Sequence, residues 1–262
     1  MRLRIVGKTE KRYFIPFNYQ YQLHSSIYGL IQKSSQKYSE FLHDKGFIAQ
    51  KRVFKLFAFS MLKIKPFKIC KEGFLNVSQI EFIFSTLVDK SLEHLVQGIF
   101  EEQKIFLQFL KDNKVEFDVR LVEILPKPIF QDTMKFKCLS PIITSTKKLI
   151  DGVFKPHYLE YKTGEDKEHF EKNIKQNLIK KYEAFYGKPY ERDFEFSFKF
   201  DESYIKKQKG KIYKLIDFKG LKVKGVFAPF EIKAPKELIE VGWEAGFGEK
   251  CSGGFGMGYL QP

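Results

Sequence analysis

The chain has 262 residues, of which 43% are hydrophobic and 30% are charged, and this balance excludes wholesale disorder. Its 46 lysine and arginine residues outnumber 32 acidic residues, and the resulting formal charge of +14 favours a polyanionic partner such as nucleic acid. Three widely spaced cysteines exclude a disulfide framework and paired-cysteine zinc sites, and without a long apolar run we expect a cytoplasmic protein that neither is exported nor spans a membrane.

The first half of the chain predicts strands and helices in alternation. Residues 1–6 alternate apolar and basic side chains, which is typical of a strand with one buried face. Leu23, Ile27 and Ile31 then recur at helical spacing, with Asn18 placed to cap the helix. Two β-rich tracts, a second amphipathic helix and the strand-like tract KVEFDVRLVEIL follow. The order β-α-β-β-α-β predicts a ferredoxin-like unit, with both helices on one face of an antiparallel sheet.

From Pro126 the same order repeats. A strand, a helix, further strands, the helix PKELIEVGWEAG and a short terminal strand follow in turn, although residues 147–168 show no clear pattern. The sequence therefore predicts an α+β protein of two tandem ferredoxin-like domains, residues 1–125 and 126–262.

Basic residues gather where the predicted elements meet solvent. The run KKQKGKIYK, which contains Lys209, Lys211 and Tyr213, predicts an exposed hairpin tip that grips phosphate, with a solvated loop as the alternative. Arg2 and Arg4 flank the first strand, where alternate side chains face either the open sheet or the cleft between domains. We expect RNA to follow that cleft.

The most specific tract is GFGEKCSGGFGMGY, directly after the last predicted helix. Glycine permits positive φ and close approach of another backbone or a phosphate, so the tract predicts either an RNA-binding loop or a tight packing element. The lack of a Lys followed by Ser or Thr excludes a nucleotide-binding P-loop. The candidate RNA-binding glycines are Gly246, Gly248, Gly253, Gly254 and Gly256.

This tract resembles the C-terminal glycine-rich signature of the repeat-associated RNA-binding (RAMP) superfamily, and within it the CRISPR repeat-processing endoribonucleases of the Cas6 family. The segments PFNYQYQLHSSIY, FLHDKG and KLFAFS resemble family segments in the same order. The resemblance implies tandem ferredoxin-like domains and cleavage of CRISPR repeat RNA. It also implies products with 5′-hydroxyl and 2′,3′-cyclic phosphate ends.

Such cleavage needs a base for the 2′-hydroxyl, an acid for the leaving oxygen and a cation near phosphorus, and side chains alone can supply all of them. The resemblance places the catalytic residues at His43, Tyr28 and Lys55. In the favoured assignment His43 protonates the leaving oxygen, Tyr28 orients or deprotonates the 2′-hydroxyl, and Lys55 balances the charge. His24 is the alternative histidine, because it lies one helical turn before Tyr28.

The spacing of the histidines offers no metal site, and we expect no cofactor. The expected partner is CRISPR repeat RNA, with other CRISPR-associated effector subunits and a homodimer left open. A non-catalytic RNA-binding subunit of a CRISPR effector complex is the alternative function. A small-ligand or protein-binding module is a third, because a fold alone does not determine function.

Overall fold

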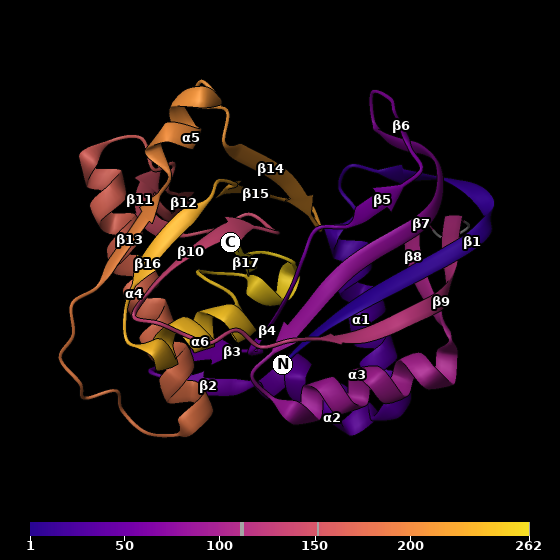
Figure 1. Ribbon diagram of the computed structural model, residues 1–262, viewed down its shortest axis with the longest axis horizontal. Coiled ribbons are helices and arrows are strands. Elements are labelled where there is room, and N and C mark those ends of the chain that lie inside the picture. The colour runs from indigo at the N-terminus through magenta and orange to yellow at the C-terminus, as the bar shows by residue number, and fades with distance from the viewer. Residues whose placement is uncertain (111–112, 151, 262) are drawn as a thin grey trace.

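The computed structural model describes residues 1–110, 113–150 and 152–261, which form two α+β units lying side by side (Figure 1). Most of the indigo and magenta part of the chain forms one unit and the rose, orange and yellow part forms the other, while the purple hairpin of residues 47–54 lies against the second unit (Figure 1). No helix among the described residues is long and apolar enough to cross a lipid bilayer.

The described part of the first unit has a seven-stranded sheet with the central order β4-β7-β1-β9-β8, and β5 and β6 pair with β7. Leu3 and Ile5 alternate with Arg2 and Arg4 along β1, so the apolar side chains face the helices α1 and α3 while the arginines face the other side. The elements are β1 (Arg2–Pro16), α1 (Gln20–Ser34), α2 (Gln36–Glu40), the π-helical η1 (Phe41–Lys45), β2 (Phe47–Ala49), β3 (Arg52–Phe54), β4 (Phe57–Phe59), β5 (Lys63–Lys65), β6 (Lys68–Ile69), β7 (Gly73–Thr86), α3 (Asp89–Glu102), β8 (Lys104–Leu110) and β9 (Asn113–Leu125).

The described residues of the second unit form a four-stranded sheet in the order β13-β16-β10-β17, with the hairpins β11–β12 and β14–β15 beside it. The patternless stretch before α4 thus contains part of a hairpin, which the sequence did not predict. The elements are β10 (Thr133–Cys138), β11 (Ser145–Ile150), β12 (Val153–Tyr158), α4 (Gly164–Tyr186), β13 (Ser197–Phe200), α5 (Glu202–Lys207), β14 (Tyr213–Phe218), β15 (Leu221–Val226), β16 (Phe230–Lys233), α6 (Lys236–Ala245), η2 (Cys251–Gly253) and β17 (Gly258–Leu260).

Each sheet has the ferredoxin-like strand order. Numbering only the strands of the β-α-β-β-α-β repeat, β4-β7-β1-β9 and β13-β16-β10-β17 both read second, third, first, fourth. The predicted tandem ferredoxin-like fold is therefore confirmed, and β8 is an added edge strand in the first unit.

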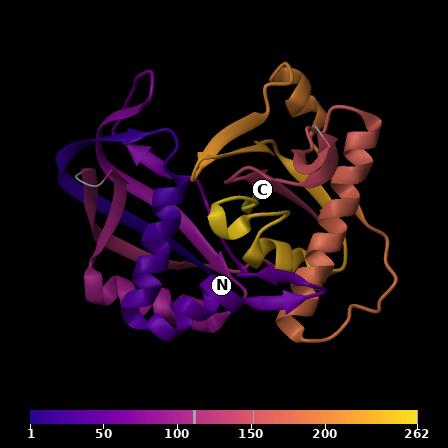
Figure 2. The same cartoon turned by 180° about the vertical axis from the view of Figure 1, so that it is seen from behind.

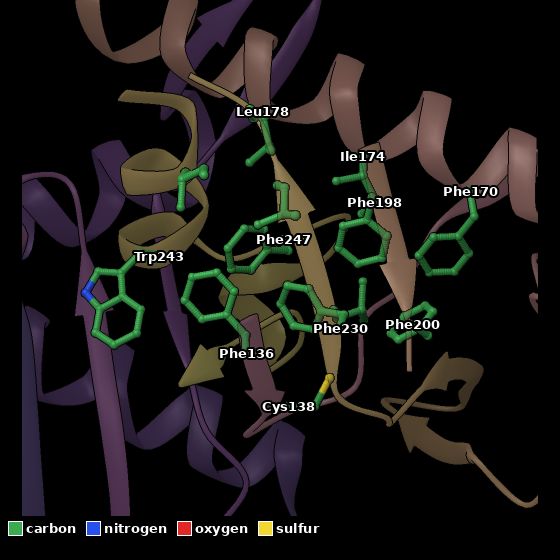
Figure 3. Close-up of a cluster of buried hydrophobic side chains, with 14 of the residues drawn as sticks. Phe136, Cys138, Phe170, Ile174, Leu178, Phe198, Phe200, Phe230, Trp243 and Phe247 are labelled. Atoms are coloured by element: carbon green, nitrogen blue, oxygen red, sulfur yellow. The ribbon is translucent and has the colours of Figure 1, made fainter. Parts of the chain in front are cut away.

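Aromatic side chains fill the core of the second unit (Figure 3). Phe136, Phe198 and Phe230 project from the sheet, and Phe170 and Ile174 of α4 pack on them. The rings of Phe198 and Phe230 stack with centroids 4.9 Å apart, and that of Phe170 lies 5.8 Å from Phe198. Burial of such large apolar surfaces dominates the stability of a core, so this layer fixes α4 against the sheet.

The start of α1 differs from the prediction. The helix begins at Gln20 after Tyr19, and no side chain caps it. The Oδ1 atom of Asn18 instead accepts a hydrogen bond from the backbone N–H of Asp217, 3.0 Å away in the β14–β15 hairpin. Asn18 therefore joins the two units and does not cap its own helix.

Candidate functional site

His24 lies on α1 where the first unit meets the C-terminal end of the second. Its Nδ1 is 2.7 Å from the carbonyl oxygen of Ser252 in η2. Because a carbonyl can only accept, Nδ1 carries the proton and Nε2 is the basic nitrogen of the ring. The rings of Tyr28 and Phe218 flank the imidazole, with centroid distances of 4.7 Å and 5.6 Å. Contacts from both units thus fix the orientation of His24.

Burial lowers the pKa of His24, and the charges of His43 and Lys55 lower it further, against the opposing effect of the Ser252 hydrogen bond. The imidazole is therefore neutral near pH 7 and able to accept a proton. Lys55 and Ser252 line the same cleft, so the segment that carries His43 and Lys55 lies near the segment that holds His24.

Tyr28 follows His24 by one helical turn and packs on the ring of Phe57 in β4. Burial raises the pKa of its phenol well above the usual value. The phenol stays protonated near neutrality, so Tyr28 can donate a hydrogen bond but is poorly suited to act as a base.

His43 lies in the π-helical turn η1, with 78% of its side chain exposed and Nδ1 2.6 Å from Oδ1 of Asp44. The chain leaves this turn at Gly46, whose φ is +59°, and an added Cβ would lie 2.6 Å from the carbonyl oxygen of Phe54. Lys55 follows β3 and its Nζ donates to the carbonyl oxygen of His43, 2.6 Å away. Burial lowers the pKa of Lys55, against the attraction of Asp44.

The glycines of the C-terminal tract are buried. A Cβ on Gly248 would lie 2.4 Å from the carbonyl oxygen of Ile143, and one on Gly256 would lie 2.2 Å from that of Phe247. Gly246, Gly248, Gly253, Gly254 and Gly256 thus permit close packing of the tract between the units, which was the alternative to an RNA-binding loop, and their contact with RNA stays a prediction (Figure 2).

A lysine that the sequence analysis did not single out holds this tract in place. Lys181 on α4 is 3% exposed, and its Nζ donates to the carbonyl oxygens of Ala245, Gly246 and Gly248 at 3.2, 2.6 and 3.1 Å. It also lies 3.2 Å from Sγ of Cys251, the residue before Ser252. The sequence did contain a signal for the burial of Lys181, because it follows the buried Leu178 by three residues and so lies on the same face of the helix.

Only some of the basic side chains that were predicted to contact RNA lie at the surface. Arg2 is 1% exposed, donates to the carbonyl oxygens of Gly258 and Trp243, and lies over the indole of Trp243, so its side chain joins the two units. Arg4 pairs with Glu123 on the neighbouring strand, 2.9 Å away.

Lys209 and Lys211 are exposed, as predicted, but their local structure differs from the prediction. They lie in the turn between α5 and β14, not at a hairpin tip. The tip of the β14–β15 hairpin is formed instead by Lys219 and Gly220, next to the Phe218 ring that packs on His24.

A cleft of about 780 Å³ opens beside the histidines. Its walls come from β3, the β11–β12 hairpin, α4 and the glycine-rich tract, and Lys55 and Ser252 belong both to the cleft and to the histidine site. Arg52, Lys147 and Lys250 add positive charge to its lining. Sequence reasoning missed these three because they belong to no basic run.

The tandem ferredoxin-like fold also occurs in a solved protein that binds RNA. A solved RAMP protein described as binding different RNA substrates has a TM-score of 0.79 and 19% identity, with 100% of both chains covered, which shows the shared fold. Residues 14–122 match the model of the N-terminal part of CRISPR-associated protein Cas6, and residues 125–259 match that of its C-terminal part.

Two curated relatives have the same family name as the matching family models. The CRISPR-associated endoribonuclease Cas6 1 of Methanocaldococcus jannaschii is 34% identical over 98% of this chain and 91% of its own length. The CRISPR-associated endoribonuclease Cas6 of Pyrococcus furiosus is 30% identical over 97% of this chain and 87% of its own. A solved CRISPR-associated Cas6 protein has a TM-score of 0.75 and 31% identity, covering 100% of this chain and 99% of that one. The chain belongs to the Cas6 family of CRISPR-associated proteins.

Proposed function

We propose that this chain cleaves CRISPR repeat RNA, and the support from its relatives is that they are named CRISPR-associated endoribonucleases. The observation that carries the proposal is a basic cleft lined by Lys55 and Ser252, which hydrogen-bond to His43 and His24, with Tyr28 packed on His24. In this proposal residues 1–125 carry the catalytic side chains, and residues 126–262 supply the tract that orients them.

The proposed reaction is an internal transfer at phosphorus. A base removes the proton of the 2′-hydroxyl, the 2′-oxygen bonds to the neighbouring phosphorus, and the bond to the 5′-oxygen breaks. The departing 5′-oxygen takes a proton, which leaves a 2′,3′-cyclic phosphate and a 5′-hydroxyl. The steps balance with one acid and one base and need no metal ion.

The geometry favours His24 over Tyr28 as the base. The Nε2 of His24 is unprotonated in the tautomer that Ser252 selects, whereas the raised pKa of Tyr28 keeps its phenol protonated. Tyr28 then orients the 2′-hydroxyl or a phosphate oxygen. His43, exposed to solvent, is assigned as the acid, and Lys55 balances the charge that develops on the phosphate oxygens.

Cleavage of the cognate repeat RNA in excess chelator tests the proposal. We expect wild type to cut, His24→Ala and His43→Ala each to lose about 100-fold to 10,000-fold in rate, and the control His169→Ala, an exposed histidine on α4, to cut normally. End mapping checks the cyclic phosphate.

The outcomes separate the alternatives. If only one histidine variant loses activity, the acid-base pair is wrong and that histidine acts with another group. Activity that requires an added divalent ion contradicts the metal-independent reaction. RNA that binds but stays intact in wild type points instead to a non-catalytic RNA-binding subunit of a CRISPR effector complex.

A further inference from the structure

The cleft beside the histidine site is large and polar enough to hold more than a phosphate. Its volume of about 780 Å³ exceeds the roughly 300 Å³ at the lower end of small-ligand pockets. Because Lys55 and Ser252 line both the cleft and the histidine site, a nucleotide in the cleft would lie close to the bond proposed to be cut. The part of its wall formed by α4 contains Asn177, a buried residue whose side chain indicates a ligand.

The side chain of Asn177 lies on α4 within the cleft lining, is 5% exposed, and its Oδ1 has no hydrogen-bond partner among the described residues. Buried amide groups nearly always have partners, and one that lacks a partner calls for an explanation such as a ligand. One turn earlier, Asn173 donates to the carbonyl oxygen of Ser145 at 3.1 Å, so the same wall also contains a satisfied amide.

The opposite part of the cleft offers an aromatic surface. Phe154 in β12 lines the cleft and is 68% exposed, so its ring is open to a stacking partner. Single-stranded bases are held by stacking on such rings, and nearby cations hold their phosphates. Lys147 and Arg52 supply the positive charge here.

We infer that the cleft binds one unpaired nucleotide next to the cleaved bond, with its base stacked on Phe154 and read by the amide of Asn177. An amide presents an acceptor beside a donor. The unpartnered Oδ1 accepts an N–H of the base edge, which is an amino group in adenine or cytosine and a ring N–H in uracil or guanine. Purine and 2-pyrimidinone are adenine and cytosine without that amino group, so they isolate this hydrogen bond from stacking. The inference rests on the proposed function, since it places the nucleotide beside the histidine site.

Binding to uncleavable RNA tests the inference without depending on cleavage. Repeat RNA carrying a 2′-deoxy sugar at the attacking nucleotide is made with adenine, purine, cytosine or 2-pyrimidinone at the two positions on either side of the bond. We expect wild type to prefer adenine to purine, or cytosine to 2-pyrimidinone, by about tenfold at one of these positions. Asn177→Leu keeps the side-chain volume and removes the unpartnered oxygen, so it should fold normally and reduce the preference to below about twofold.

The matched variants separate base reading from general binding. Gln176→Ala, an exposed residue next to Asn177, should keep the preference. Phe154→Ala should weaken binding about tenfold for all four bases and abolish the quenching of 2-aminopurine placed at the preferred position. Asn177→Leu that retains the preference, or wild type that binds all bases equally, overturns this inference alone. RNA that does not bind at all overturns it together with the proposed function.

Discussion

Replacing Lys181 with methionine removes the ammonium that joins α4 to the glycine-rich tract. The carbonyl oxygens of Ala245 and Gly246 then lose this donor in a buried site, while that of Gly248 keeps a hydrogen bond from Sγ of Cys251. A buried carbonyl without a partner costs about 1–3 kcal/mol, so the two together cost about 2–6 kcal/mol. Methionine offsets part of this because no ammonium has to be desolvated, which leaves about 3 kcal/mol. For a chain of this size that equals a fall of about 6–12 °C in melting temperature.

Thermal denaturation followed by circular dichroism measures this change, with Lys172→Met, an exposed lysine on the same helix, as the control. The control should stay within about 0.5 kcal/mol of wild type. Single-turnover cleavage at 25 °C, where Lys181→Met is still folded, should fall at least about tenfold, because Ser252 no longer holds the imidazole of His24 in place. A melting temperature equal to wild type would refute the role of the ammonium. Lower stability with unchanged cleavage would refute its link to His24.

Further predictions concern the pH dependence and the packing between the units. The pKa of His24 is lower in the folded chain than in the unfolded chain, so the unfolded chain binds more protons as the pH falls through about 6.5. The free energy of unfolding should therefore decrease below that pH. Equilibrium unfolding of His24→Phe should show a smaller decrease. The rate of wild-type cleavage should fall on the acid side with an apparent pKa below about 6.5, read from a pH–rate profile. Gly254→Ala should lower the melting temperature measured by calorimetry more than Gly187→Ala, since both have positive φ but only at Gly254 would a Cβ lie 2.4 Å from Phe59. Arg2→Met should broaden the calorimetric transition, because the buried guanidinium joins the first strand to the second unit.

Local patterns in the sequence predicted the strands and helices of the two ferredoxin-like units. They did not predict the contacts between the units or the added hairpins. The alternation of Leu3 and Ile5 with Arg2 and Arg4 predicted β1 and its two faces correctly. Which arginine is buried could not be predicted, because the partners of Arg2 are backbone carbonyls of the second unit and a backbone group has no sequence signature. The hairpin at 145–158 was missed for a related reason: side chains along β12 such as Phe154 are exposed, so no alternation marks the strand.

At the candidate site, too, the sequence could not predict contacts with distant segments of the chain. The residue types and the helical spacing of His24 and Tyr28 could be read from the chain. Their ionisation could not, because it depends on burial and on an acceptor in a distant segment. A resemblance carries residue positions across a family, but the division of work between an acid and a base is a property of the folded surroundings.

The hydrogen bond between His24 and Ser252 spans 228 positions of the chain. During synthesis the first unit is complete long before η2 leaves the ribosome, and until then the imidazole has neither its tautomer-selecting acceptor nor the wall that buries it. A nascent chain, or one shortened by proteolysis before Ser252, therefore contains the histidines but not the site. The orientation of His24 therefore depends on docking of the glycine-rich tract against the first unit.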